Sequence, residues 1–309
     1  MGAGTRSLAL LAILTLIMRR RNRGILALEE PETFLFPHAQ RRVLHEALML
    51  ADQTFVTTHS PYVLEQIPID AVGKLERAKD DELCYVQLTN VSPKTGKLYN
   101  KRLRQAFSEA MLGTAVLVVE GESDKWWVDA AGQILDGVID GNFTHEAFDL
   151  TGITVVSSET HGDSLKTAEF FKSLNLPVVI LLDKIDDQQV VASHQQSGFP
   201  TIFLRQSGIE QAIVQNLQLP LVTAFLTNAP LASGQNLQPA DLTGKTDTEL
   251  RATMFSILKK NKGSRYTHEW IIDQLGLQGF PQPILESVRL TNRHYFAGET
   301  INGVLFLIA

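Results

Sequence analysis

The sequence has little cysteine and no long apolar run. Cys84 is the single cysteine among 309 residues, so no internal disulfide can form, which suits a reducing compartment. The apolar run from Leu8 to Met18 is far shorter than the roughly 20 residues of a membrane span. Arginines follow this run, whereas a signal peptide carries its positive charge before the apolar run. We therefore expect a cytoplasmic protein with no membrane partner.

An excess of basic charge is also missing. The formal net charge is −6, so the chain lacks the overall basic footprint that many nucleic-acid-binding domains show. Carboxylates that bind divalent cations would account for part of this negative charge, because the ions reverse the local sign. Hydrophobic residues make up 44% of the chain, which is enough for packed cores. The length of 309 residues predicts two domains.

A phosphate-binding loop of the G-x-x-x-x-G-K-[ST] type does not occur in the sequence. The nearest match is Gly244-Lys245-Thr246, where Pro239 takes the place of the first glycine. Such a loop cradles the β- and γ-phosphates of a nucleotide, so we expect no ATPase activity from this chain by itself. The chain is interpreted as part of a longer protein.

Short apolar runs alternate with helical patterns along most of the chain. Runs such as Ile25–Leu28, Ala115–Val119 and Val178–Leu182 are typical of buried parallel strands. This alternation predicts an α/β fold with two parallel sheets, one in residues 1–107 and one in residues 108–309. Beyond about Leu217 the pattern becomes mainly helical.

Carboxylates and a histidine follow the two strands of the first predicted sheet. Glu29 and Glu30 end the first strand, and His59 follows the next one, Thr54–Thr57. In open α/β sheets, ligands bind beyond the carboxyl ends of the strands, where these residues are expected to lie. An NTPase needs acids there to hold Mg²⁺ and to orient water, and a neutral histidine can bind a phosphate. Acids at a strand end can also be merely structural.

These residues resemble a known group of ATPases. E-E-P-E followed by T-H-S-P resembles the Walker B, D-loop and H-loop of ABC-type ATPases of the chromosome-maintenance and OLD group. Gly2 and Gly4, in G-A-G-T-R-S, are similar to the signature motif. The resemblance implies that residues 1–107 are the C-terminal portion of an ABC-type ATPase domain. It also implies that Glu29, Glu30, His59, Gly2 and Gly4 contribute to nucleotide binding, with ATP held only in the full-length homodimer.

A second set of carboxylates follows strands of the second predicted sheet. Glu120 and Asp124 come after Ala115–Val119, and Asp183 comes after Val178–Leu182. Acids that converge at one sheet edge repel each other unless cations lie between them. Such hard oxygen ligands suit Mg²⁺ or Mn²⁺, and a two-metal site would stabilise both the attacking and the leaving oxygen of a phosphodiester.

This set resembles the Toprim fold of topoisomerases, primases and OLD nucleases. The resemblance implies that Glu120 is a metal ligand and an acid–base catalyst, and that Asp124 and Asp183 bind metal. The second acid of the D-x-D motif would fall at Ile185, so Asp186 or Asp187 is expected to replace it, with Asp186 as the assigned ligand.

Two later residues complete the implied site. Glu210, in Gly208-Ile-Glu210, corresponds to a further metal-linked acid, and Lys262 to a lysine that stabilises charge on the phosphate. Each also has an ordinary interpretation, since an acid that opens a helix favours the helix dipole and lysine clusters are usually solvated.

The resemblance implies an OLD-family, metal-dependent DNA endonuclease, with a Toprim domain over 108–309 and a helical segment from about residue 217. An ATPase would regulate it in a homodimer, in phage defence, with a helicase or another defence protein as a further partner left open. The alternatives are an RNA-processing Toprim enzyme and a non-catalytic DNA-binding or dimerisation module. The sequence leaves open the cleavage specificity, the strand preference and the oligomeric state.

Overall fold

The computed structural model describes residues 24–77, 82–87, 104–229, 236–262 and 264–296, together with residues 9, 12, 13 and 16. Gly2 and Gly4, assigned to nucleotide binding, lie outside the described residues. The chain divides into two compact units, Met1–Leu112 and Gly113–Ala309. The boundary predicted after residue 107 falls inside helix α5 (Arg104–Met111) of the first unit.

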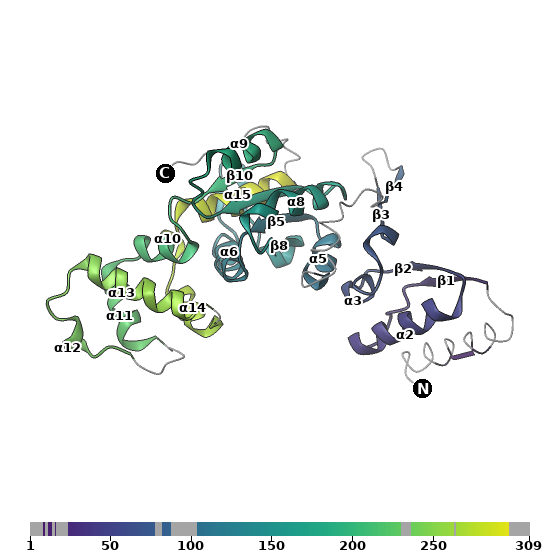
Figure 1. Cartoon of the computed structure of the whole chain (residues 1–309), viewed down its shortest axis with the longest axis horizontal. Coiled ribbons are helices and arrows are strands. Elements are labelled where there is room, and N and C mark those ends of the chain that lie inside the picture. The colour runs from purple at the N-terminus through teal and green to yellow at the C-terminus, as the bar shows by residue number, and fades with distance from the viewer. Residues whose placement is uncertain are drawn as a thin grey trace. The chain divides into compact units, whose positions relative to one another are not determined.

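The described part of the first unit contains two small sheets. Strands β1 (Ile25–Glu29) and β2 (Gln53–Thr57) are parallel and are joined through helix α2 (Pro37–Leu50). Strands β3 (Gly73–Arg77) and β4 (Leu83–Gln87) form an antiparallel pair. Helix α3 (Pro61–Leu64) and the 3-10 turn η1 (Ile69–Ala71) lie between the two pairs in the sequence, as Figure 1 shows in purple and blue.

The prediction that Ile25–Leu28 is a fully buried strand is wrong for the structure described. Leu26 is buried, but Ile25 is 68% exposed, and exposure alternates along β1 with the period of a strand that is covered on one face. The physical reason is that β1 and β2 pair only with each other among the described strands. Side chains such as Phe55 on β2 are therefore exposed.

The second unit is built on one parallel sheet of four strands in the order β10-β9-β5-β8. Its strands are β5 (Ala115–Val119), β8 (Ile153–Ser157), β9 (Val178–Leu182) and β10 (Thr201–Phe203). Every residue of β5 and of β9 is buried, as expected for central strands with helices on both faces. The predicted α/β fold with a parallel sheet is confirmed.

Helices cover both faces of this sheet (Figure 1). Helices α6 (Glu122–Ile134) and α15 (Gln282–Phe296) contact each other and the sheet, whereas α8 (His161–Lys172) packs on β9 and β5 together with its neighbour α9 (Gln188–Ser197). The remaining elements are β6 (Ile139–Asp140), β7 (Phe143–Thr144), α7 (Phe148–Thr151), α10 (Ile209–Asn216), α11 (Leu219–Asn228), α12 (Pro239–Leu242), α13 (Asp247–Lys260), α14 (Arg265–Ile272) and the 3-10 turn η2 (Leu277–Gly279).

The main core of the second unit joins the sheet to the helical segment. Side chains of β5 such as Leu117 share one buried cluster with Trp127 of α6, Phe225 of α11, Met254 of α13 and Ile271 of α14. The helical segment is thus an integral part of the second unit rather than a separate domain. None of the helices described is long and apolar enough to cross a membrane.

Candidate metal centre

Four carboxylates from four elements meet beyond the carboxyl ends of the sheet. Glu120 follows β5 and Asp183 follows the adjacent strand β9, while Asp124 and Glu210 lie in the first turns of α6 and α10. The parallel pairing of β5 with β9 brings Glu120 and Asp183 to the same edge. The structure thus brings these four acids to one edge of the sheet, and their role as metal ligands stays a prediction.

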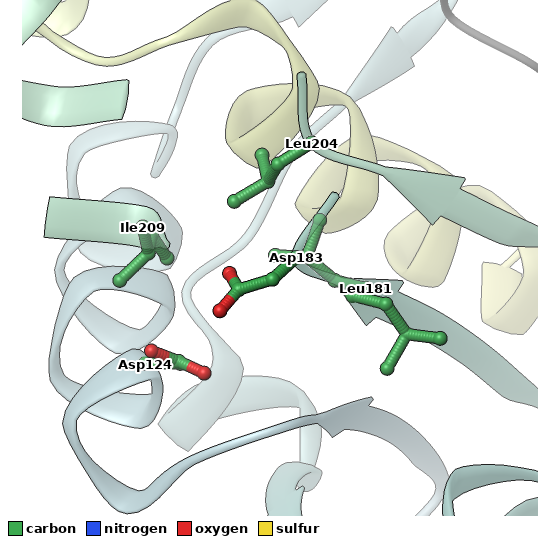
Figure 2. A pocket seen from close by; sticks show the side chains of 6 residues that line it. Asp124, Leu181, Asp183, Leu204 and Ile209 are labelled. Carbon is green, nitrogen blue, oxygen red and sulfur yellow. The ribbon is translucent and has the colours of Figure 1, made fainter. Parts of the chain in front are cut away.

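Asp183 carries the clearest electrostatic sign of this convergence. Burial raises the pKa of Asp183 to about 7, and the charges of Asp124 and Glu120 add to the increase. The positive charge of Lys262 lowers the pKa of Asp183. In Figure 2 the carboxylates of Asp124 and Asp183 point toward each other across a small depression, which Leu181, Leu182, Leu204 and Ile209 also line.

Asp124 is held in place by the turn that precedes it. The backbone N–H of Gly121 donates a hydrogen bond of 2.7 Å to Oδ2 of Asp124, which caps helix α6. Burial raises the pKa of Asp124 to about 6; the Gly121 hydrogen bond opposes this change, and the charge of Glu210 adds to it. The carboxylate is therefore fixed in orientation while its ionised form is disfavoured.

Glu210 is buried although it opens a helix. Its side chain is 3% exposed, and Oε1 has no hydrogen-bond partner among the described residues. The Nζ atom of Lys262 lies 3.6 Å from this oxygen, which is ion-pair distance but too long for a hydrogen bond. A buried carboxylate oxygen without a hydrogen bond is costly unless a cation compensates for it.

Gly208 keeps the space between two of these carboxylates open. A Cβ atom at position 208 would lie 3.4 Å from Oε2 of Glu210 and 3.9 Å from Oδ2 of Asp183. A longer side chain would therefore extend between the two acids. In the sequence, Gly208 stands out only as part of the segment before Glu210; its position after β10, at the same sheet edge, is the signal for its role.

His161 is a further neighbour of the cluster that the assigned ligands do not include. Its Nδ1 atom lies 3.9 Å from Oε1 of Glu120. His161 begins helix α8, which follows β8, and β8 pairs with β5. The signal in the sequence is therefore a histidine soon after a strand that neighbours the strand ending at Glu120.

Asp186 and Asp187, the two candidates for the missing D-x-D ligand, are oriented differently from Asp183. Asp186 is 83% exposed, and its Oδ1 atom lies 2.8 Å from Nζ of Lys184. Asp187 caps helix α9 by accepting a hydrogen bond from the backbone N–H of Gln189. The structure does not bring either one into the cluster, so the assignment of Asp186 as a ligand stays a prediction.

The chemistry of the cluster suits a divalent cation. Within the residues described, no group of three His, Cys, Asp or Glu side chains is already close enough to hold a metal ion. Carboxylates without a cation between them repel each other, and in Asp124 and Asp183 this repulsion adds to the increase in pKa that burial causes. Hard oxygen donors, one of them buried without a hydrogen bond in Glu210, fit Mg²⁺ or Mn²⁺.

The first unit places part of the predicted nucleotide site at a strand edge. Glu29 ends β1 and Glu30 follows it, and Nε2 of His59 lies 3.6 Å from Oε1 of Glu30. Glu30 has a φ of 42°, and Glu32 accepts hydrogen bonds from Thr58 and from the backbone of His59. The segment after β1 is thus tied to the segment after β2, while both Glu30 and His59 stay exposed.

Two family models match the chain. Residues 1–64 match an AAA ATPase domain, and residues 111–184 match the Toprim domain of proteins like the overcoming lysogenization defect (OLD) protein. A search of curated proteins found no match.

Among solved structures, the chain is similar to the C-terminal region of the Xanthomonas campestris pv. campestris OLD protein. The identity is 15%, the match covers 62% of this chain and 97% of that one, and the TM-score is 0.45. For the C-terminal region of the Burkholderia pseudomallei OLD protein, the identity is 14%, the coverage 59% and 98%, and the TM-score 0.43. Residues 1–64 and 111–184 thus match the pair of domains that the sequence predicts, and the predicted resemblance to OLD-like proteins is confirmed over these two segments.

Proposed function

We propose that this protein cleaves phosphodiester bonds of DNA with Mg²⁺ or Mn²⁺, held by Glu120, Asp124, Asp183 and Glu210. The observation that carries the proposal is the convergence of these four carboxylates from four elements beside the ammonium group of Lys262. An OLD-like Toprim domain supports the same class of chemistry, phosphoryl transfer.

Each residue has a distinct task in this proposal. Bound cations would supply Lewis-acid stabilisation of the charge on the reacting phosphoryl oxygens. The carboxylates of Glu120 and Asp183 are presented from adjacent strands, which makes their spacing rigid. Lys262, only half-exposed and directed at the cluster by Glu210, would oppose negative charge that develops on the phosphate. Leu204 and Ile209 would exclude water from one side of the reacting group.

The ATPase segment supports a regulatory role in the same proposal. Glu30 and His59 would face nucleotide only in a full-length homodimer that also supplies a phosphate-binding loop, which the present sequence lacks. We propose accordingly that ATP regulates DNA cleavage, and that phage defence is the setting. ATP hydrolysis by this chain alone is not part of the proposal.

The test is incubation of the purified chain with supercoiled plasmid in Mg²⁺ or Mn²⁺. We expect nicked or linear product with the wild-type protein and none with Glu120→Gln or with EDTA. Glu122→Gln is the matched control, because Glu122 is two positions away and its side chain is 63% exposed. Absence of product with any metal, or equal cleavage by the Glu120→Gln variant, would contradict the proposal. Cleavage of single-stranded RNA but not of DNA would instead favour an RNA-processing enzyme.

A further inference from the structure

The connection between α13 and α14 is strongly basic and adjoins the carboxylate cluster. Lys259, Lys260, Lys262 and Arg265 occur within seven positions, and no acidic residue lies between Glu249 and Glu269. The three lysines are exposed, whereas Arg265 pairs with Glu269 at 2.7 Å. Three positive charges are therefore exposed to solvent next to a site that is otherwise acidic, and that of Lys262 faces the carboxylate of Glu210.

Tyr266 presents an exposed ring beside these lysines. It is 76% exposed, whereas all other Phe, Tyr and Trp side chains described within residues 113–293 are buried or partly buried. No ring–ring contact among the described residues involves Tyr266. The ring contacts of α14 are those of His268 and Trp270. The ring is thus mostly open to solvent in the part of the chain that the structure describes.

The helix that carries Tyr266 fixes the direction of its ring. On α14, His268 is fully buried and contacts Trp126 and Trp127 edge-on, with ring centroids 5.2 and 5.5 Å apart. Residues two positions apart on an α-helix point about 200° apart. Tyr266 therefore lies on the opposite face of α14 from the packed residues.

The position of Tyr266 relative to the cluster follows from chain geometry. Lys262 contacts Glu210 at 3.6 Å, and Tyr266 is four residues further along. Four residues span at most about 14 Å. This distance corresponds to about four nucleotides along one strand of a duplex, at about 3.4 Å each. A strand with a phosphate at Lys262 can consequently reach Tyr266 with a nearby base.

We propose that Tyr266 stacks on an unpaired base of a DNA strand whose phosphates contact Lys259, Lys260 and Lys262, so that the site selects single-stranded or locally opened DNA. Lysines alone attract any polyanion, but a flat exposed ring adds affinity only for a ligand with flat rings. The bases of an intact duplex have no free face for it. This inference rests on the proposed function, since it names the form of DNA that the same site takes.

The test measures binding without cleavage. The full chain carrying Glu120→Gln is titrated in Mg²⁺ against a short single-stranded DNA that contains a fluorescent adenine analogue, and against the matching duplex. Anisotropy reports the affinity, and quenching of the analogue reports stacking. Tyr266→Ala is compared with Tyr266→Phe, which keeps the ring, and with Leu150→Ala, which removes another exposed apolar side chain, at the opposite edge of the sheet.

We expect Tyr266→Ala to weaken single-strand binding by about 5- to 150-fold, the range for one base–aromatic stack, and to abolish the quenching. Tyr266→Phe and Leu150→Ala should bind as the Glu120→Gln parent does, and duplex binding should change little. Equal affinities for Tyr266→Ala and the parent, or an equal loss with Tyr266→Phe, would overturn the inference. If the wild type cleaves plasmid but Tyr266→Ala does not weaken single-strand binding, only this inference is rejected. If single-strand binding depends on Tyr266 but no DNA is cleaved, only the proposed nuclease activity is rejected.

Discussion

The Nζ atom of Lys262 lies 3.6 Å from Oε1 of Glu210, a carboxylate oxygen buried without a hydrogen bond among the residues described. Glu210 lies in the first turn of the first helix after β10, whereas Lys262 follows α13, inside the helical segment. The pairing of these two residues makes the helical segment part of the candidate metal centre. It also places a positive charge where negative charge would develop on a phosphate.

Replacing Lys262 separates catalysis from metal binding. We expect Lys262→Met to lower the single-turnover rate of DNA cleavage by about 10²- to 10³-fold, as for loss of one group that stabilises transition-state charge. Affinity for Mn²⁺ should not fall, because all four carboxylates remain and a competing cation is removed. Lys245→Met, at an exposed lysine of the same segment, is the control. A wild-type rate for Lys262→Met would rule out this role.

Filling the space at Gly208 is predicted to block the site without unfolding the protein. In Gly208→Leu, the new side chain would start 3.4 Å from Oε2 of Glu210 and extend among the carboxylates. We expect loss of Mn²⁺ binding, measured by calorimetric titration, with little change in melting temperature. Gly276→Leu is the matched control, since a Cβ at that exposed glycine has no neighbour within 4 Å. Equal Mn²⁺ affinity in both variants would contradict the assigned site.

His194 is predicted to make folding stability depend on pH. Burial between α8 and β10 lowers the pKa of His194 to about 4, from 6.5. As the pH falls, the unfolded chain therefore takes up the proton before the folded chain does. The contribution of neutral His194 to folding stability is fully present above pH 6.5 and is lost as the pH falls toward 4. The full change is on the order of 3 kcal/mol, at about 1.4 kcal/mol per pKa unit.

The measurement compares the free energy of unfolding of wild type and His194→Gln between pH 7 and pH 4. Asp124 and Asp183 act with the opposite sign, because their raised pKa values stabilise the fold at low pH and lose that effect as the pH rises toward 6 or 7. Both proteins share this background, so the difference between them isolates His194. The exposed His59 supplies the control variant, His59→Gln. Parallel pH profiles for wild type and His194→Gln would refute the prediction.

The central strands of the second unit were predictable because they are buried on both faces. Ala115–Val119 and Val178–Leu182 are unbroken apolar runs, and the structure has strands with the same bounds. Strand β10 was not predicted, because three residues, Thr201–Phe203, are too few to show a period. Helix α9 was missed because Gln188–Ser197 is mostly polar and buries only His194.

The candidate site was predictable where a ligand directly follows a strand, as at Glu120 and Asp183. The site was less predictable where tertiary packing determines the orientation of a side chain. Glu210 has the local signature of a solvated helix start, but its side chain is buried and its ion-pair partner, Lys262, is remote in the sequence. Asp186 lies one position beyond the second acid of a D-x-D motif, and its side chain pairs with Lys184 at the surface. Spacing alone does not specify the direction of a side chain in a loop.

The carboxylates of Glu120, Asp124, Asp183 and Glu210 are proposed to bind a divalent cation, and every other role proposed for the site depends on that ion. The most direct test is titration of the purified chain with Mn²⁺, followed by calorimetry and by the rise in melting temperature that a ligand of the folded state must cause. We expect binding by the wild type and by Asp186→Asn, and loss of both signals in Asp183→Asn and Glu210→Gln. Equal binding by Asp183→Asn, or loss of binding only in Asp186→Asn, would contradict the site as assigned.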